Sequence, residues 1–229
     1  MIQGRLVLAT SNTRKLEELR VIFDDLCGRS GTPDTPIEIV GLDALNPRID
    51  EPIEDKDTFE GNAIIKARHY ADASGTCCLA DDSGLEVDSL AGEPGVRSAR
   101  YAWVAGLSRK DVDAANIELL LRNLGDTPVE ERAARFVCVM AVCMPNVVRP
   151  LAVVRGTVEG RILGPGDAGY CAHGPSGRGE NGFGYDPVFF VPELGLTAAE
   201  MSQAQKNSIS HRGNAARLMW HEIVNARGA

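Results

Sequence analysis

An apolar segment of this sequence runs directly into two adjacent carboxylates. Between Cys78 and Asp88, the pair Asp81 and Asp82 follows an apolar run and precedes a Ser-Gly pair. We predict a strand over Cys77–Ala80 that ends at these two acids. Neighbouring carboxylates repel each other unless a cation or a shared proton relieves the repulsion, and Mg²⁺ binds through one or two carboxylates together with substrate phosphates. The pattern favours a metal site at the strand end, although a turn rich in Asp, Ser and Gly is the simpler alternative.

The composition is that of a globular protein with an acidic balance. The 229 residues are 44% hydrophobic and 24% charged, enough to bury a core in one large domain or in two joined lobes. The formal net charge of −8 disfavours a broad surface for nucleic acid or anionic membranes. No apolar run approaches the roughly 20 residues that span a bilayer, and the first predicted strand begins too early for a secretory signal. We therefore expect a cytoplasmic protein that binds neither nucleic acid nor membrane. The protein could still bind a small anionic ligand, because one pocket can be basic while the protein as a whole is acidic.

The cysteines are predicted to be structural thiols. Their spacing contains no CxxC pair and no Cys/His zinc pattern, and most of them lie in or beside apolar runs, where reduced thiols behave as small hydrophobes. They are Cys27, Cys77, Cys78, Cys138, Cys143 and Cys171.

The spacing of apolar residues predicts a mixed α/β fold. Strands are predicted at Arg5–Thr10, Glu38–Leu42, Cys77–Ala80, Ala133–Cys143, Leu151–Val158 and Val188–Val191. Helices are predicted after Ser11-Asn12, after capping boxes at Asp57–Glu60 and Thr197–Glu200, from Ser108, and over Arg212–Val224. The glycine-rich segment Gly164–Gly184 is predicted to be a long mobile loop. Alternating elements at both ends and a β-rich middle favour a single domain over residues 1–229, with an elongated mixed sheet, flanking helices and two lobes around a cleft.

A polar turn joins the first predicted strand to the first predicted helix. It contains Thr10, Ser11, Asn12, Thr13, Arg14 and Lys15. Backbone N–H groups at a helix N-terminus, with polar and basic side chains beside them, form a phosphate site. An ordinary helix cap followed by a solvated basic residue is the competing interpretation. The chain has no GxxxxGK[ST] motif, so the turn is not a P-loop.

Polar residues also surround the start of the second predicted helix. Glu51 and Glu54 lie in an acidic loop ahead of it, and Asn62 and Lys66 are one helical turn apart. Such a pair presents an amide and an ammonium to one ligand. A solvated helix face is the alternative.

A third polar cluster lies near the C-terminus. Phe183 stands between two glycines, which lets the backbone come close to a flat ligand on which the ring stacks. Asp186 precedes Pro187 and is expected to be extended. His211 and Arg212 carry donors suited to a carbonyl or a phosphate, unless they are simply the exposed first turn of a helix capped by Ser210.

These motifs, taken in order, resemble one family. They are Ser11-Asn12 with Lys15, Thr58-Phe59 with Asn62 and Lys66-Ala67, Ala80–Leu85, Pro94-Gly95 with Ser98–Tyr101, Phe183–Pro187, and Lys206 with Ser210–Arg212. The chain resembles the inosine triphosphate pyrophosphatase family in its bacterial form, the XTP/dITP diphosphatases. The resemblance runs from about Leu6 to Ile223. Each motif is weak alone, but six in the same order are a specific signal.

The resemblance implies an enzyme that converts ITP, dITP or XTP to the monophosphate and pyrophosphate with Mg²⁺ as cofactor, in a central nucleotide-binding cleft. It implies a phosphate-binding role for Thr10–Lys15 and Lys66, and a substrate contact by Ser83. Asp82 corresponds to the metal-linked proton acceptor, and Glu54, or else Glu51, to the second metal ligand. Asp81 is also predicted to be catalytic, either by tuning Asp82 or by orienting a metal-bound water. Base recognition is implied for Phe183, Gly184, Tyr185, Asp186, Lys206, His211 and Arg212.

The resemblance also implies a homodimer, in which Trp103 is either an interface aromatic or a core residue. Two features depart from the family pattern. The loop Gly164–Asn181 is longer than expected, and Gly61 stands where an acidic residue is common. Two other functions remain open: a related pyrophosphatase with a different base preference, such as modified pyrimidines, and a purine nucleotide sensor without turnover.

Overall fold

The structure is a computed structural model that describes residues 4–30, 37–102, 106, 108–171 and 176–228. Trp103 and residues 172–175 of the predicted loop lie outside the described residues. The chain divides into two compact units. Unit 1 contains Met1–Asp82, Cys138–Gly156 and His211–Ala229, and unit 2 contains Ser83–Val137 and Thr157–Ser210.

Helices and strands alternate along the chain. The α-helices are α1 (Thr13–Ser30), α2 (Phe59–Ser74), α3 (Arg109–Leu124), α4 (Gln203–Ile209) and α5 (His211–Gly228). The strands are β1 (Arg5–Leu8), β2 (Glu38–Gly41), β3 (Cys78–Val87), β4 (Ala133–Cys143), β5 (Ala152–Ile162), β6 (Phe189–Val191) and β7 (Leu196–Thr197). Short 3₁₀ helices are η1 (Leu42–Ala44), η2 (Asp88–Leu90), η3 (Gly95–Arg100) and η4 (Val129–Glu131).

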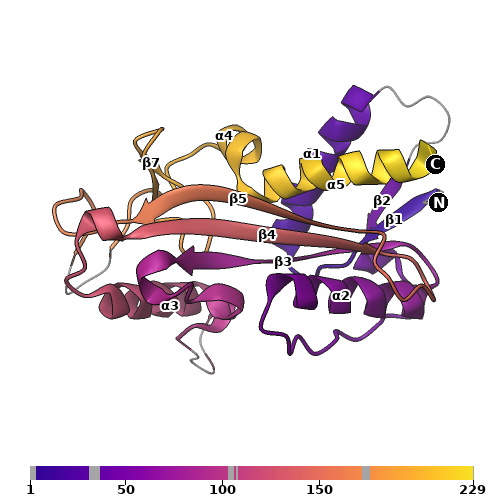
Figure 1. Cartoon of the computed structure of the whole chain (residues 1–229), viewed down its shortest axis with the longest axis horizontal. Helices are drawn as coiled ribbons and strands as arrows, with labels where there is room; N and C mark the ends of the chain where they lie inside the picture. Colours follow the sequence, from indigo (N-terminus) through magenta and orange to yellow (C-terminus); the bar gives the residue numbers. More distant parts are fainter. Residues whose placement is uncertain (1–3, 31–36, 103–105, 107, 172–175, 229) are drawn as a thin grey trace. The chain divides into compact units, whose positions relative to one another are not determined.

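The strands of the described residues form one mixed sheet in the order β2-β1-β3-β4-β5-β6-β7. Strand β1 is parallel to both β2 and β3, while β6 is antiparallel to β5 and β7. The register places Val7 opposite Cys78 and Leu8 opposite Leu79. Helices flank the sheet (Figure 1). This arrangement confirms the predicted α/β class with a mixed sheet and flanking helices.

Strand β3 continues past the two acids, and the prediction of a strand ending at Ala80 was wrong. It runs to Val87, so Asp81 and Asp82 lie within the strand. Beyond the Ser-Gly pair, Leu85 and Val87 are both fully buried and alternate along the strand. Burial of these two side chains outweighs the turn preference of Ser-Gly, because strand conformation depends on packing more than on local propensity.

The core of unit 1 lies between the sheet and the pair α1 and α5. Leu19 and Phe23 of α1 and Met219 and Trp220 of α5 pack in one cluster with apolar residues of β1, β3 and β4. The rings of Phe23 and Trp220 are 6.2 Å apart. Figure 1 shows α1 and α5 next to each other on one side of these strands and α2 on the other. Unit 1 is therefore a small three-layer structure built on its parallel strands.

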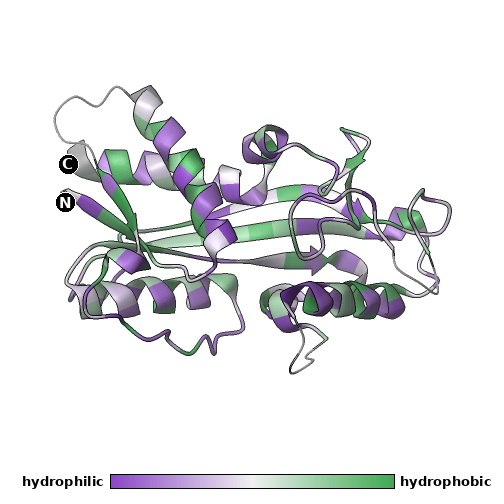
Figure 2. Ribbon diagram, turned by 180° about the vertical axis from the view of Figure 1, so that it is seen from behind, coloured by the Kyte–Doolittle hydropathy of each residue, from purple (hydrophilic) through white to green (hydrophobic). Residues whose placement is uncertain are grey.

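The core of unit 2 is built mainly from α3 and the strands. Leu120 and Leu124 of α3 join a cluster with Phe136 and Phe189, whose rings are 4.4 Å apart. Arg132 is fully buried beside this core, and its guanidinium donates to the carbonyl oxygens of Thr127, Leu163 and Gly125. The helices carry purple and green along the same ribbon in Figure 2, as expected of elements that are buried on one side.

Two of the predicted helix starts, the capping boxes at Asp57–Glu60 and Thr197–Glu200, differ from the structure. Ser108 caps α3 as predicted. Helix α2 is capped by Thr58, whose side chain accepts from the N–H of Gly61, and not by Asp57. The Thr197–Glu200 pair closes a turn beside β7, and the capping box that starts α4 is formed by Ser202 and Gln205. Thr197 pairs with Phe190 in the sheet, so its backbone is not available to start a helix.

All six cysteines are free thiols, as predicted, and the four expected in apolar runs are buried. Burial raises the pKa of Cys77 and Cys138 to about 12, which keeps both thiols protonated. Among the helices of the described residues, none combines the length and the apolar character needed to cross a bilayer.

Candidate active site

The turn between β1 and α1 is organised by Asn12. Its side-chain oxygen accepts from the backbone N–H groups of Arg14 and Lys15 at 3.1 and 3.3 Å, so Asn12 caps α1 as predicted. The hydroxyl of Thr10 accepts from the N–H of Asn12 at 3.2 Å. The cap directs the first turn of α1, and with it the side chain of Lys15, towards β3.

Asp81 lies at the centre of a cluster of cations inside unit 1. It is 2% exposed, and its Oδ2 accepts from the ammonium of Lys15 at 2.8 Å. The guanidinium Nε of Arg212 lies 3.9 Å from the same oxygen. Burial alone would raise the pKa of Asp81, but the charges of Lys15 and Arg212 outweigh it and hold the pKa well below its usual range. Asp81 is therefore an ionised carboxylate that is already neutralised by protein side chains.

Arg212 is held on its other side by Glu18. Its guanidinium, 3% exposed, donates to the Glu18 carboxylate. Gly156 of β5 lets α5 lie directly on the strand, because a Cβ there would collide with the backbone of His211 and Ala215. Glu18 was not among the predicted site residues. Its spacing could have indicated it, because Glu18 is three residues after Lys15 and so lies on the same face of a helix.

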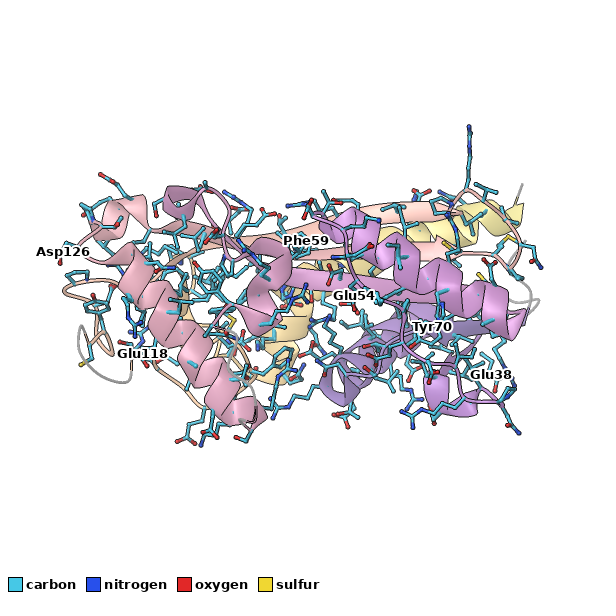
Figure 3. All side chains as sticks on the ribbon, turned by 90° about the horizontal axis from the view of Figure 1, so that it is seen from below. Glu38, Glu54, Phe59, Tyr70, Glu118 and Asp126 are labelled. Carbon is cyan, nitrogen blue, oxygen red and sulfur yellow. The ribbon has the colours of Figure 1, made fainter. Side chains whose placement is uncertain are left out.

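Asp82 is contacted by two side chains from one face of α2. The amide of Asn62 donates to Asp82 Oδ2 at 3.2 Å, and the ammonium of Lys66 lies 3.6 Å from Asp82 Oδ1. Lys66 also donates to Glu54 at 3.1 Å. Asn62 and Lys66 were predicted to serve one ligand together, and in the structure both converge on Asp82. Along the chain, Glu54 precedes Phe59, the first residue of α2, and Figure 3 labels both residues.

The two adjacent aspartates differ in charge balance. Asp81 has two cationic neighbours, whereas Asp82 shares Lys66 with Glu54. Burial raises the pKa of Asp82 above its ordinary value, since the opposing charges of Lys66 and Lys15 do not fully offset it. For Lys66, burial alone would lower the pKa, but Asp82, Asp81 and Glu54 outweigh it and raise the pKa. Asp82 is thus the carboxylate whose negative charge is less fully offset than that of Asp81.

The donors around Asp82 suit Mg²⁺. Within the residues that the structure describes, no three or more His, Cys, Asp and Glu side chains gather as a metal cage. Mg²⁺ does not require such a cage, because it keeps several waters and takes one or two carboxylates plus substrate phosphates. Glu54 and Asp82 already meet around one cationic group, so they can supply that pair. Glu51, the alternative second ligand, is one of the charges near Tyr70.

The turn around Phe183 belongs to unit 2 and is organised by Asp186. Its carboxylate accepts from the N–H of Phe183 at 2.8 Å and from the ammonium of Lys206 at 2.6 Å. The N–H of Gly184 donates to Asp113 at 3.0 Å. Asp186 lies within a turn, and not in an extended segment as predicted from Pro187. Its carboxylate shapes the turn and anchors Lys206.

Tyr185 differs from its neighbours in this turn because its side chain is part of the unit 2 core. It is 4% exposed, and its hydroxyl donates to the carbonyl oxygen of Ser98 at 2.9 Å. Burial raises the pKa of this phenol far above its usual range. The ring and the hydroxyl of Tyr185 are therefore both occupied within unit 2, where they hold the turn against its core.

The described parts of the long loop before this turn are tied to the strands of unit 2. Asp167 forms a bidentate pair with Arg161 at 2.6 and 2.8 Å. Arg178 pairs with Glu200 at 2.9 Å, and its N–H donates to the carbonyl of Pro187 at 2.9 Å. The start of the loop is thus held on β5 by Asp167, and its end is held at Pro187 by Arg178.

Gly182 is required by the Asp186–Lys206 pair. Its φ is +84°, and a Cβ there would collide with both charged groups. Gly182→Ala should therefore lower the free energy of unfolding by about 1–2 kcal/mol through backbone strain and by about 1–3 kcal/mol more through the collision. Urea unfolding measures this. Gly166→Ala is the matched control, because its φ is +91° with nothing within 4 Å. Equal losses in the two variants would contradict the collision.

The predicted site residues fall into both units. Unit 1 holds Thr10, Ser11, Asn12, Thr13, Arg14, Lys15, Glu54, Lys66, Asp81, Asp82, His211 and Arg212, and unit 2 holds Ser83, Phe183, Gly184, Tyr185, Asp186 and Lys206. Contacts within unit 1 join Lys15, Asp81 and Arg212 in one cluster and Glu54, Lys66 and Asp82 in another. Ser83 is half-buried in β3, and His211 is the half-buried first residue of α5.

The structure is thus a mixed α/β protein whose strand β3 carries two buried aspartates, each next to a lysine, an arrangement suited to an anionic ligand. Comparison with known proteins identifies the family. The sequence matches the Ham1 family over residues 6–222, and the chain belongs to that family.

Relatives resemble the chain over nearly its whole length. A dITP/XTP pyrophosphatase of Lactobacillus acidophilus is 45% identical, covering 93% of this chain and 94% of the relative. A dITP/XTP pyrophosphatase of Nocardia farcinica is 46% identical, covering 95% of this chain and 93% of the relative. The solved structure of a HAM1 protein from Coxiella burnetii superposes with a TM-score of 0.78 at 35% identity, covering 97% of this chain and all, 100%, of the other.

Proposed function

We propose that this protein hydrolyses non-standard purine nucleoside triphosphates, dITP, XTP and ITP, to the monophosphate and pyrophosphate. The observation that carries the proposal is its near full-length identity of 45% to a relative named dITP/XTP pyrophosphatase. The charge distribution of unit 1 is compatible with it: Lys15 and Lys66 lie beside two adjacent buried acids, and burial raises the pKa of Asp82 despite the lysine charges.

In this reaction a water oxygen forms a bond to the α-phosphorus and the bond from that phosphorus to the bridging α,β oxygen breaks. The leaving group is pyrophosphate. Asp82 accepts the proton of the attacking water, and a carboxylate whose pKa is raised by burial is a better base for this step than an ordinary one. Lys15 and Lys66 offset the negative charge of the phosphates, because enzymes of phosphoryl transfer act mainly by positioning and electrostatics.

Glu54 and Asp82 are the residues that would hold Mg²⁺. When bound there, the ion supplies charge neutralisation for the phosphate oxygens and polarises the phosphoryl group. Lys66 already holds these two carboxylates near each other, through contacts at 3.1 Å with Glu54 and 3.6 Å with Asp82.

Turnover of a nucleotide panel tests the proposal. ITP, XTP, dITP, GTP, ATP and dTTP are incubated with and without Mg²⁺, and the product is identified as pyrophosphate or orthophosphate. Mg²⁺-dependent pyrophosphate release confined to ITP, XTP and dITP is the expected result. Orthophosphate as the first product would overturn the reaction, a different substrate range would indicate another base preference, and binding without turnover would indicate a sensor.

Base selectivity is proposed to depend on donors that face the six-position of the purine. Hypoxanthine and xanthine carry a carbonyl there, and adenine carries an amino group, which leaves a donor facing a donor. His211→Ala should reduce the ITP/ATP preference by about tenfold, the value of one hydrogen bond to a polarised group. Steady-state kinetics on both nucleotides measure this.

Arg212→Ala is the second variant for this test, and it is expected to destabilise the protein as well, since it leaves Asp81 and Glu18 without their shared cation. Unchanged ITP/ATP selectivity in both variants would overturn the assignment. For Phe183, Gly184, Asp186 and Lys206 of unit 2 we retain the base-contacting role implied by the family resemblance, which Phe183→Ala tests through the KM for dITP.

We also propose a cytoplasmic homodimer. A cytoplasmic location agrees with a role in the nucleotide pool, and closed two-fold dimers are the commonest oligomers. Light scattering of the purified protein gives the mass, and a monomeric mass at micromolar concentration would contradict the dimer.

A further inference from the structure

The side chain of Asn62 uses all of its hydrogen-bonding groups within unit 1. It is 1% exposed and lies in the first turn of α2. Its Oδ1 accepts from the N–H of Lys56 at 3.0 Å, and its Nδ2 donates to the carbonyl of Lys56 and to Asp82 Oδ2, each at 3.2 Å. A side-chain amide has two donor hydrogens, and both are occupied here. Both donor hydrogens of Asn62 are therefore used within unit 1, which disfavours the prediction that its NH2 group is presented to a ligand.

Gly61 makes this arrangement possible. A Cβ at Gly61 would lie 2.7 Å from Cβ and 2.8 Å from Cγ of Lys56, closer than real atoms pack. The loop ahead of α2 thus contacts the helix through the space that a side chain would fill. The Thr58 hydroxyl also connects this loop to the helix, because it accepts from the N–H of Gly61 at 3.1 Å. The presence of Gly at this position, which departs from the family pattern, has a local packing reason.

These contacts connect the two carboxylates assigned to the metal. Asn62 binds the backbone of Lys56, two residues after Glu54, and it binds Asp82 itself. Lys66 makes a second connection between Glu54 and Asp82. The two oxygens of Asp82 are therefore divided, with Oδ2 directed to Asn62 and Oδ1 to Lys66.

We propose that Asn62, with the space left by Gly61, is a positioning residue that locks the loop carrying Glu54 to the strand carrying Asp82, so that both carboxylates face one divalent cation. The inference rests on the proposed function, which makes these two acids the Mg²⁺ ligands. Positioning groups behind metal ligands are commonly worth about 10–100-fold in metal affinity or activity. Asn62 itself touches neither the nucleotide nor the ion.

The first measurement is the Mg²⁺ concentration that gives half-maximal pyrophosphate release from dITP. Asn62→Ala should raise it by about tenfold or more, while the KM for dITP at saturating Mg²⁺ stays near the wild-type value. Gly61→Ala is an independent variant that leaves Asn62 intact. Gly to Ala inside a helix normally stabilises it by about 1 kcal/mol, yet here it should also raise the Mg²⁺ requirement, because the new Cβ displaces Lys56.

The second measurement does not depend on activity. Hydrogen exchange of the Lys56 amide, followed by NMR in the metal-free protein, should be slow in the wild type and faster in both Asn62→Ala and Gly61→Ala. Lys56→Ala is the matched control, because only the Lys56 backbone bonds to Asn62 and its side chain is half-exposed and paired with Asp55. It should change neither the exchange nor the Mg²⁺ requirement.

The outcomes separate the inference from the proposed function. A wild-type protein without pyrophosphate release contradicts the function. The exchange data still decide whether Asn62 holds the Lys56 backbone. An active wild type whose Mg²⁺ requirement is unchanged in Asn62→Ala and Gly61→Ala overturns the inference. So does a raised KM for dITP at saturating Mg²⁺ with an unchanged Mg²⁺ requirement, since that result makes Asn62 a substrate contact. If Asn62→Ala does not fold, Gly61→Ala decides alone.

Discussion

Asp82→Asn should remove nearly all pyrophosphate release without destabilising the protein. The expected loss in kcat is about a hundredfold to ten-thousandfold, the range for removing a general base. Asparagine has almost the same shape, so Asn62 keeps an acceptor and Lys66 keeps Glu54. In the proposed mechanism, the variant loses the charge that would accept the proton of water and help to hold Mg²⁺. Single-turnover measurement of pyrophosphate from dITP at saturating Mg²⁺ tests this.

The direction of the stability change in Asp82→Asn can be predicted. Because burial raises the pKa of Asp82 in the folded protein, the ionised carboxylate weakens the fold at pH values above that pKa. A neutral asparagine removes this cost, so the free energy of unfolding at pH 7 should be unchanged or higher. Asp55→Asn, at an exposed acid in the loop that carries Glu54, is the control and should retain activity. A variant that keeps more than a tenth of wild-type kcat would show that Asp82 is not the base.

Asp81→Asn should behave in the opposite way, with a large loss of stability. The substitution leaves Lys15 and Arg212 without their shared counter-charge inside unit 1, and breaking a buried ion pair in this way costs about 3–5 kcal/mol. Catalysis should fall less than in Asp82→Asn and mainly through a higher KM, because Lys15 is no longer held. Urea unfolding at pH 7 and steady-state kinetics measure the two effects.

The pH dependence of stability checks the same assignment. The lowered pKa of Asp81 means that its contribution is complete above the unfolded value of about 4 and is lost as the pH falls further. The acid limb of the stability curve should therefore be shallower in Asp81→Asn than in the wild type. Asp88→Asn is the control, since its half-exposed pair with Arg135 is worth about 1 kcal/mol or less. A loss in Asp81→Asn no larger than in this control would contradict the cation cluster.

Much of the fold could be predicted from local pattern. The strand Ala133–Cys143 was predicted with its observed bounds, and the caps Asn12 and Ser108 act as expected. These features depend on a run of apolar residues or on one polar side chain next to a helix, and both can be read from neighbouring residues. The end of β3 could not, because Leu85 and Val87 are buried by partners far away in the chain.

The candidate site was predictable by residue type and less so by role. Asn62 was expected to offer its amide to a ligand, and the structure shows the amide bonded to Lys56 and Asp82. Tyr185 was expected to contact the base, and its hydroxyl is bonded to Ser98 in the unit 2 core. The presence of a polar or aromatic residue in a motif indicates that the site needs this residue. Whether it touches the ligand or positions another residue depends on burial, which a motif does not contain.

The element types, the mixed α/β class and the adjacency of Asp81 and Asp82 follow from local spacing and residue chemistry, and could be read from the chain alone. How the two acids differ depends on the folded protein. Lys15 reaches Asp81 from 66 residues away and Asn62 reaches Asp82 from 20 residues away. The charge state of a buried carboxylate depends on the cations within a few ångströms of it and on the water it has lost. Folding sets both quantities, and for that reason two identical neighbours in the chain acquire different chemistry.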